Sequence, residues 1–133
     1  MRLPLRPVAV AIGGALGSWA RWGCAAAFPV AAGTFPVTTF VINVVGAALL
    51  GVVLVALLDG PVPRTHLHAL LGTGVLGAFT TFSTWMVESV ELVRTGHALV
   101  AATYVLLSLV AGVVAVLATM ALTRRALGRE RLA

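Results

Sequence analysis

Long apolar runs separated by short polar connections dominate this chain. Such a run must hold roughly 20 apolar residues to cross a hydrocarbon core of about 30 Å. Four runs pass this test, at about residues 8–28, 35–58, 67–87 and 98–123, and the third continues to about residue 94. The connections are too short to build a soluble domain. The pattern therefore predicts a single membrane domain over residues 1–133 with four spans.

The spans are expected to be α-helices, because lipid offers no partner for a free backbone N–H or C=O. The alternating segments of membrane barrel strands are absent from the sequence. In the first helix, Gly14, Gly17 and Arg21 share a face, and Gly13 forms a GxxxG step with Gly17. We expect this stripe to face protein. The expected fold class is an all-α integral membrane protein.

Composition and charge agree with a membrane location. Hydrophobic residues make up 60% of the chain and charged residues 10%, against about 25% charged in soluble domains. With four spans, both termini and the connection at residues 59–66 share one side. That side holds seven of the nine arginines, which are Arg2, Arg6, Arg64, Arg124, Arg125, Arg129 and Arg131. The positive-inside rule then places both termini in the cytoplasm of a cell (plasma or inner) membrane.

The third run has the most unusual composition. Residues 72–85 read Gly-Thr-Gly-Val-Leu-Gly-Ala-Phe-Thr-Thr-Phe-Ser-Thr-Trp, with three glycines and five hydroxyls. Glycine costs a helix about 1 kcal/mol relative to alanine, and hydroxyls compete for backbone groups. We therefore expect a break near residues 77–81. Non-helical backbone at this depth must be buried in protein or line a cavity, and its freed carbonyls suit a small hard cation.

Several other polar or aromatic side chains in the runs have both a packing and a transport interpretation. Arg21 either anchors its helix at the interface or draws anions into a water-filled mouth. Asn43 either bonds a neighbouring helix or offers its two N–H groups to an anion. Tyr104 and Ser108, one turn apart, either pack between helices or line a path.

Phe82 and Trp85 share a face of the third segment. The edge of an aromatic ring is the positive part of its quadrupole, so ring edges can line an anion path. On spacing alone, the same two rings could simply fill an interface between helices.

Three motifs resemble the Fluc (CrcB-type) family of fluoride channels. Residues 13–22 look like its Gly-Gly, Gly, Arg-aromatic pattern, and residues 39–51 are similar to its Thr, Asn, Gly, Leu-Leu-Gly run. Residues 74–84, with Glu88 beyond, resemble its most diagnostic motif, which has Thr-Thr-Phe-Ser-Thr at its core.

This resemblance implies a fluoride-selective channel that exports fluoride passively. It implies a dual-topology dimer of two four-helix subunits inserted antiparallel, with two fluoride paths and a structural sodium ion at the dimer centre. The backbone carbonyls of Gly77 and Thr80 would hold the sodium. Arg21 would lie in a vestibule, and the path would be lined by Asn43, Phe82, Trp85, Tyr104 and Ser108.

The chain also departs from the family pattern. Trp85 stands where a second Phe is usual, Ala78 where Gly is common, and Thr38 and Ala47 where Gly and Ser are usual. A larger ring at position 85 could narrow or close one path. The uneven arginines leave two assemblies open, because a subunit that inserts in both orientations needs balanced charge. These are a homodimer and a heterodimer with an oppositely oriented paralogue.

Other classes of protein fit less well. A proton-coupled small multidrug transporter needs a carboxylate in its first helix, and residues 8–28 contain none. A membrane subunit that transports nothing would leave the polar cluster at residues 77–84 unexplained, whereas a non-conducting partner subunit of a heterodimeric fluoride channel stays an alternative. An enzyme is not expected, because the histidines lie in or beside connections and pair with no nucleophile. Glu88 and Glu91 are expected to have helix-end or interfacial roles.

Overall fold

The computed structural model describes residues 5–59 and 64–128 of the chain. These ranges contain helices and no strand, as an all-α protein requires. The helices are α1 (Leu5–Ala27), α2 (Val37–Leu58), α3 (Thr65–His68), the π-helix η1 (Ala69–Leu76), α4 (Gly77–Phe79), α5 (Phe82–Arg94) and α6 (Ala98–Ala126).

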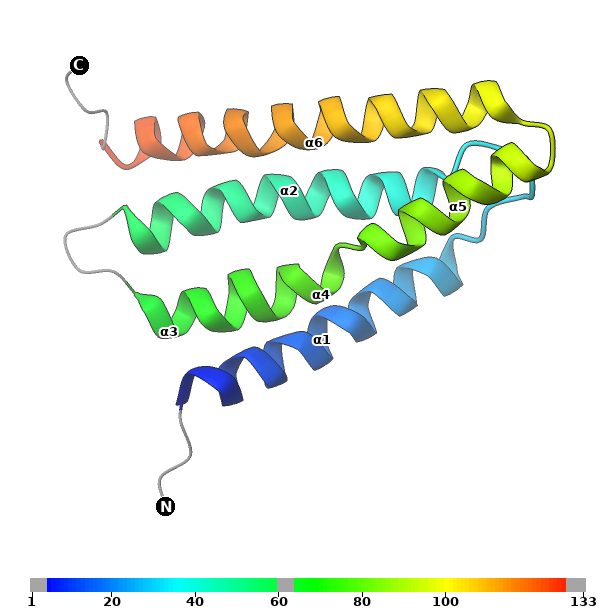
Figure 1. The fold of residues 1–133 in the computed structure, drawn as a ribbon. Coiled ribbons are helices and arrows are strands. Elements are labelled where there is room, and N and C mark those ends of the chain that lie inside the picture. The colour runs from blue at the N-terminus through cyan, green and yellow to red at the C-terminus, as the bar shows by residue number, and fades with distance from the viewer. Residues whose placement is uncertain (1–4, 60–63, 129–133) are drawn as a thin grey trace.

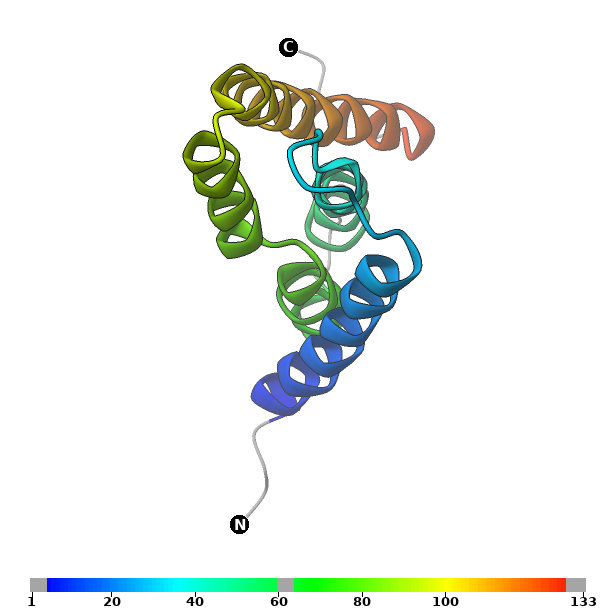
Figure 2. The same ribbon diagram turned by 90° about the vertical axis from the view of Figure 1, so that its right-hand side faces the viewer.

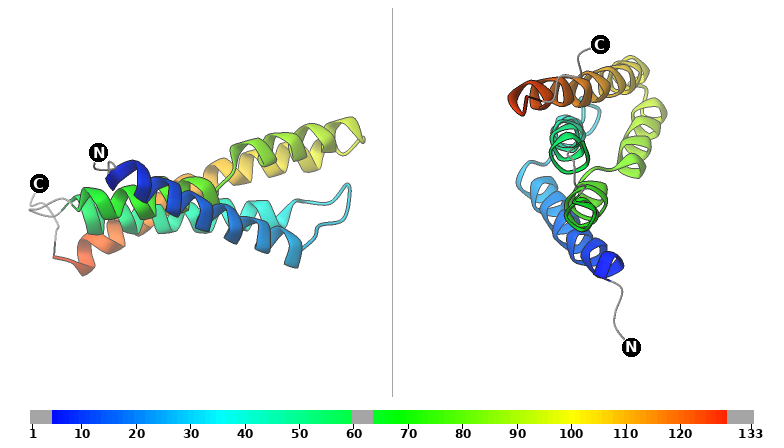
Figure 3. Two further views of the ribbon diagram at one scale, coloured as in Figure 1. Left: turned by 90° about the horizontal axis from the view of Figure 1, so that it is seen from below. Right: turned by 90° about the vertical axis from the view of Figure 1, so that its left-hand side faces the viewer.

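The long helices lie side by side, and one of them changes direction halfway. α2 packs along α6, and α1 packs along η1 and α4 (Figure 1). α5 leaves the line of α3, η1 and α4 and packs against α6 instead (Figure 2). Seen from below, α5 and the first part of α6 splay away from the ends of α1 and α2 (Figure 3). The change of direction follows Phe79 and divides the third segment into two half-helices.

Three helical stretches in the described ranges are long and apolar enough to cross a membrane. They are Val37–Leu58, Thr65–Arg94 counted through its break, and Ala98–Ala126. The chain is therefore a multi-pass membrane protein. α1 is not among these three, so its role as a fourth span stays a prediction. Its 23 residues would extend about 34 Å at 1.5 Å per residue, enough for a hydrocarbon core.

Two polar contacts tie the helices together at one end of the molecule. Arg124 Nε on α6 forms an ion pair with Asp59 Oδ2 at 2.9 Å, next to the end of α2. Arg6 Nη2 on α1 donates a hydrogen bond to Thr65 Oγ1 at 3.0 Å. The start of α1, the end of α2, the start of α3 and the end of α6 all lie here (Figure 1, left).

The described arginines are unevenly divided between the two ends of the bundle. The end that holds the described termini carries Arg6, Arg64, Arg124 and Arg125. Arg94, the last residue of α5, lies at the other end of the bundle, and Arg21 lies toward that end of α1. Arg2, Arg129 and Arg131, on which the predicted orientation also depends, lie outside the described residues. The cytoplasmic location of the termini stays a prediction.

Glycines in α1 set how closely it approaches the third segment. Gly13 and Gly17 are buried, and a methyl group on them would collide with the carbonyl oxygens of Leu70 and Val75 respectively. Both therefore face protein, as expected. At Gly14 a methyl group would meet nothing within 4 Å in the described chain, so the expectation that this residue faces protein stays a prediction.

These glycines give the first testable prediction. We expect Gly17→Ala to lower the free energy of unfolding by about 1–3 kcal/mol, since the added methyl group must push α1 away from η1. Gly14→Ala, the matched control, should leave stability unchanged or slightly raised. The measurement is SDS-induced unfolding in detergent micelles, followed by circular dichroism. Equal unfolding midpoints for the two variants would contradict this packing.

Candidate functional site

The third segment is broken at two threonines. α4 ends at Phe79, and α5 begins at Phe82. Between them Thr80 has ψ 156°, and Thr81 has φ −144° and ψ 123°, so both are extended. The break predicted near residues 77–81 is confirmed. It is narrower than expected, because Gly77 itself keeps helical angles of −63° and −29°.

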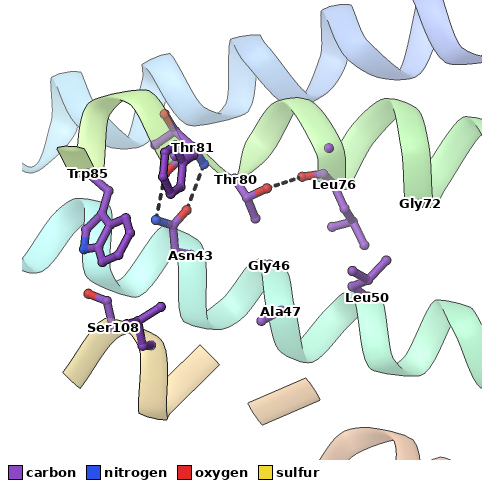
Figure 4. A pocket seen from close by; sticks show the side chains of 13 residues that line it. Asn43, Gly46, Ala47, Leu50, Gly72, Leu76, Thr80, Thr81, Trp85 and Ser108 are labelled. Atoms are coloured by element: carbon purple, nitrogen blue, oxygen red, sulfur yellow. Dashed lines mark hydrogen bonds between the residues drawn. The ribbon is translucent and has the colours of Figure 1, made fainter. Parts of the chain in front are cut away.

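Asn43 on α2 holds the break in place. Its Oδ1 accepts a hydrogen bond from the backbone N–H of Thr81 at 2.8 Å, and its Nδ2 donates to Thr81 O at 3.0 Å (Figure 4). The side-chain amide thus satisfies both backbone groups of one extended residue. An amide NH₂ has two N–H groups, so one of them remains for another acceptor. The packing and the donor interpretations of Asn43 are therefore compatible.

Backbone carbonyls lose their helical donors at the break, among them those of Gly77 and Thr80. In a continuous helix, the N–H of Thr81 would bond Gly77 O and that of Thr84 would bond Thr80 O. Instead Thr81 N–H is donated to Asn43, and Thr84 N–H is donated to Thr81 Oγ1 at 3.1 Å, which caps α5. The carbonyls of Gly77 and Thr80 are the two that the family resemblance assigns to sodium.

Other polar groups of the break are paired within the chain. Arg21 Nε donates to Ala78 O at 3.0 Å, which ties the guanidinium of α1 to the broken segment. Leu76 O accepts both the backbone N–H and the hydroxyl of Thr80, at 3.0 and 2.9 Å. Arg21 is therefore more than a lipid-facing anchor, and its vestibule role stays a prediction.

A groove of about 370 Å³ lies beside the break, between α2, the two halves of the third segment and α6 (Figure 4). No carboxylate, arginine or histidine is among the described residues that line it. Of the eight predicted site residues, six line the groove, namely Asn43, Gly77, Thr80, Phe82, Trp85 and Ser108. Tyr104 and Arg21 lie outside it.

The two predicted path aromatics have different surroundings. Phe82 and Trp85 meet edge to face, with ring centroids 5.5 Å apart. Phe82 is 71% exposed in the single chain, whereas Trp85 is 8% exposed and packs with Leu92, Ala101 and Tyr104. Trp85 therefore fills the helix interface and lines the groove at the same time, as the edge-to-face ring geometry allows.

Glu88 forms a polar cluster that sequence reasoning missed. Its Oε1 accepts from Thr39 Oγ1 at 2.8 Å and its Oε2 from the hydroxyl of Tyr104 at 2.7 Å. It thereby joins α2, α5 and α6. Because Glu88 lies in the middle of α5, the helix-end role is wrong, and the interfacial role stays a prediction. A signal was present, because Trp85 and Glu88 share one face of α5 with the buried Leu92.

The family model for "CrcB-like protein, Camphor Resistance (CrcB)" matches residues 8–120 of this chain. The chain belongs to the CrcB-like family. It is 48% identical over 92% of its length to fluoride-specific ion channel FluC 3 of Streptomyces avermitilis, and 45% identical over 71% to FluC 2 of that organism. It spans 60% of the length of each. It is 39% identical to FluC of Saccharophagus degradans, over 89% of both chains.

The matched region of the CrcB-like family contains the whole site. It begins inside α1 and ends inside α6, so the break, the groove and the Glu88 cluster all lie within it. The resemblance drawn from the three motifs is therefore confirmed at the level of the family.

The second prediction concerns Asn43. We expect Asn43→Leu to lower the free energy of unfolding by about 1–3 kcal/mol, because it leaves the buried N–H and C=O of Thr81 without partners. Thr103→Val is the matched control, since its hydroxyl bonds only a carbonyl of its own helix, Leu99 O. Its unfolding midpoint in SDS should stay near that of the wild type. If Asn43→Leu were no less stable than Thr103→Val, the stabilising role of the two Asn43–Thr81 hydrogen bonds would be refuted.

Proposed function

We propose that this CrcB-like protein is a fluoride-selective channel that lets fluoride leave the cell passively, and that it is no enzyme. The names of its curated relatives, which are fluoride-specific ion channels, support this function and disfavour the small multidrug transporter. The observation that carries the proposal is the break at Thr80 and Thr81 beside the groove. One side of the break offers carbonyl oxygens, and the groove offers hydrogen-bond donors.

Fluoride would exchange its water for fixed donors along the groove. The available donors are the second N–H of Asn43, the hydroxyl of Ser108 and the positive ring edges of Phe82 and Trp85. Because no carboxylate lines the groove, an anion meets no fixed negative charge among the described lining residues. Donors spaced for a small anion would discriminate against chloride.

The Gly77 and Thr80 carbonyls would hold a structural sodium ion. Backbone carbonyls freed from a broken membrane helix are suitable ligands for a small hard cation, and these two have lost their helical donors. Two oxygens leave most of the coordination of such a cation open. A second subunit that brings the same carbonyls to the same place would complete it, which is the dimer-centre site that the resemblance implies.

The exposed Phe82 and the groove beside it are consistent with a second subunit in the channel. We propose an antiparallel dimer of subunits with four spans each, α1 included. S. avermitilis has relatives named FluC 2 and FluC 3, so a heterodimer with an oppositely oriented paralogue stands beside the homodimer, in which this chain could be a non-conducting partner. The described arginines favour both termini on the cytoplasmic side of the cell membrane.

The third prediction tests conduction. Liposomes loaded with potassium fluoride and containing only this chain should release fluoride, measured with a fluoride electrode, and should retain chloride. We expect Phe82→Ile to slow the release by about tenfold or more, an increase of about 1.4 kcal/mol in the barrier, because it removes a ring edge from the path.

The control for this experiment is Leu117→Ala, on an exposed part of α6 away from the groove, which should release fluoride at the wild-type rate. If the chain alone releases no fluoride but does so when co-reconstituted with a FluC paralogue, the homodimer is excluded. Absence of fluoride release in both preparations would refute the channel function.

The fourth prediction tests the sodium ion. A ligand that binds only the folded state raises stability by about 2.7 kcal/mol at one hundred times its Kd. We therefore expect the Tm of the purified protein in detergent to rise with sodium and to saturate. Potassium and N-methylglucamine at the same ionic strength are the controls and should give a smaller rise. Identical Tm curves in the three salts would argue against a sodium site.

A further inference from the structure

Two buried hydrogen-bond donors have no partner among the residues that the structure describes. They are Nε1 of Trp85 and Oγ of Ser108. Trp85 is 8% exposed, and its indole nitrogen is a donor that cannot accept a hydrogen bond. Buried polar groups are nearly always paired, so two unpaired donors call for an explanation.

The two donors line the same groove. Trp85 lies on α5 and Ser108 lies on α6, and both are groove-lining residues. Figure 4 shows the Ser108 hydroxyl directed toward the edge of the Trp85 ring that carries the nitrogen. No hydrogen bond joins the two residues directly. A guest between them would have to accept a hydrogen bond from each.

No side-chain oxygen of the groove accepts a hydrogen bond from either donor. Asn43 Oδ1 already accepts from Thr81 N–H, and Thr81 Oγ1 already accepts from Thr84 N–H. The carboxylate of Glu88, one turn beyond Trp85, accepts from two hydroxyls and does not line the groove. As the described side chains are arranged, none of them pairs these donors, so the groove has room for an acceptor from outside the chain.

We propose that Trp85 Nε1–H and Ser108 Oγ–H together form a fluoride-binding site in the groove. This inference rests on the proposed channel function and deepens it. Fluoride is small and accepts strong hydrogen bonds, so one ion can take both donors at once. A family member with Phe at this position would present only a weakly positive ring edge to the ion. The indole of Trp85 adds an N–H donor to that edge. Trp85 thus strengthens fluoride binding at this point of the path.

The test is a fluoride titration of the full-length protein in detergent micelles, with ¹⁵N in the tryptophan indoles. The chain has three tryptophans, and Trp19 and Trp22 are 74% and 66% exposed, so their signals serve as internal controls. Trp85→Phe assigns the third signal. We expect its indole proton to shift downfield and to saturate with fluoride, but not with chloride at the same ionic strength.

Variants of Ser108 separate a shared site from an isolated indole. Ser108→Ala should raise the fluoride concentration at half saturation by about tenfold, which corresponds to about 1.4 kcal/mol. Ser108→Thr keeps the hydroxyl and should stay near the wild-type value. Should Ser108→Ala fail to fold, the wild-type titration still decides, because it needs no variant of Ser108.

The same preparation, reconstituted into liposomes, distinguishes the two ways to fail. If fluoride efflux is intact but the Trp85 indole signal does not shift with fluoride, this binding site is refuted and the channel function is not. Water would then lie between the two donors. Absence of both the efflux and the shift, also with a FluC paralogue present, would overturn the proposed function and this site with it.

Discussion

The exchange of two hydrogen bonds between Asn43 and Thr81 is the interaction on which the rest of the site depends. A helix that opens inside a membrane leaves backbone groups that cost several kcal/mol each when unpaired. A carboxamide is one of the few side chains that offers a donor and an acceptor together. By satisfying both groups of Thr81, α2 allows the third segment to stay open. The carbonyls of Gly77 and Thr80 can then remain available.

One break creates two ends of opposite partial charge. α4 ends in carbonyl groups, the negative end of a helix, while α5 begins after Thr81 with its N–H groups, the positive end. Oppositely polarised helix ends at one depth can serve a cation and an anion without an ionised side chain. The groove, whose described lining has no charged side chain, agrees with this division. Arg21 adds a positive charge from α1 by binding Ala78 O.

The sequence was sufficient for what depends on local composition and insufficient for what depends on packing. Glycines and hydroxyls predicted the break, but its position at Thr80 and Thr81 is set by Asn43 from another helix. From their spacing alone, Tyr104 and Ser108 were expected to have the same role, either packing between helices or lining a path. The structure separates them, because Tyr104 is fully buried against Trp85 and Ser108 faces the groove. No pattern within a single helix could show that Thr39 and Tyr104 converge on Glu88.

The structure shows where the bulk of Trp85 lies, and whether it narrows or closes a path stays a prediction. The ring is 8% exposed and packs edge to face on Tyr104 at 6.5 Å, so its bulk is taken up between α5 and α6. What reaches the groove is the chemistry of its edge. A phenyl ring in the same place would present only C–H groups there, whereas the indole presents a donor that no neighbouring side chain pairs. In the proposed channel, the departure at position 85 would therefore act on how strongly an anion is held.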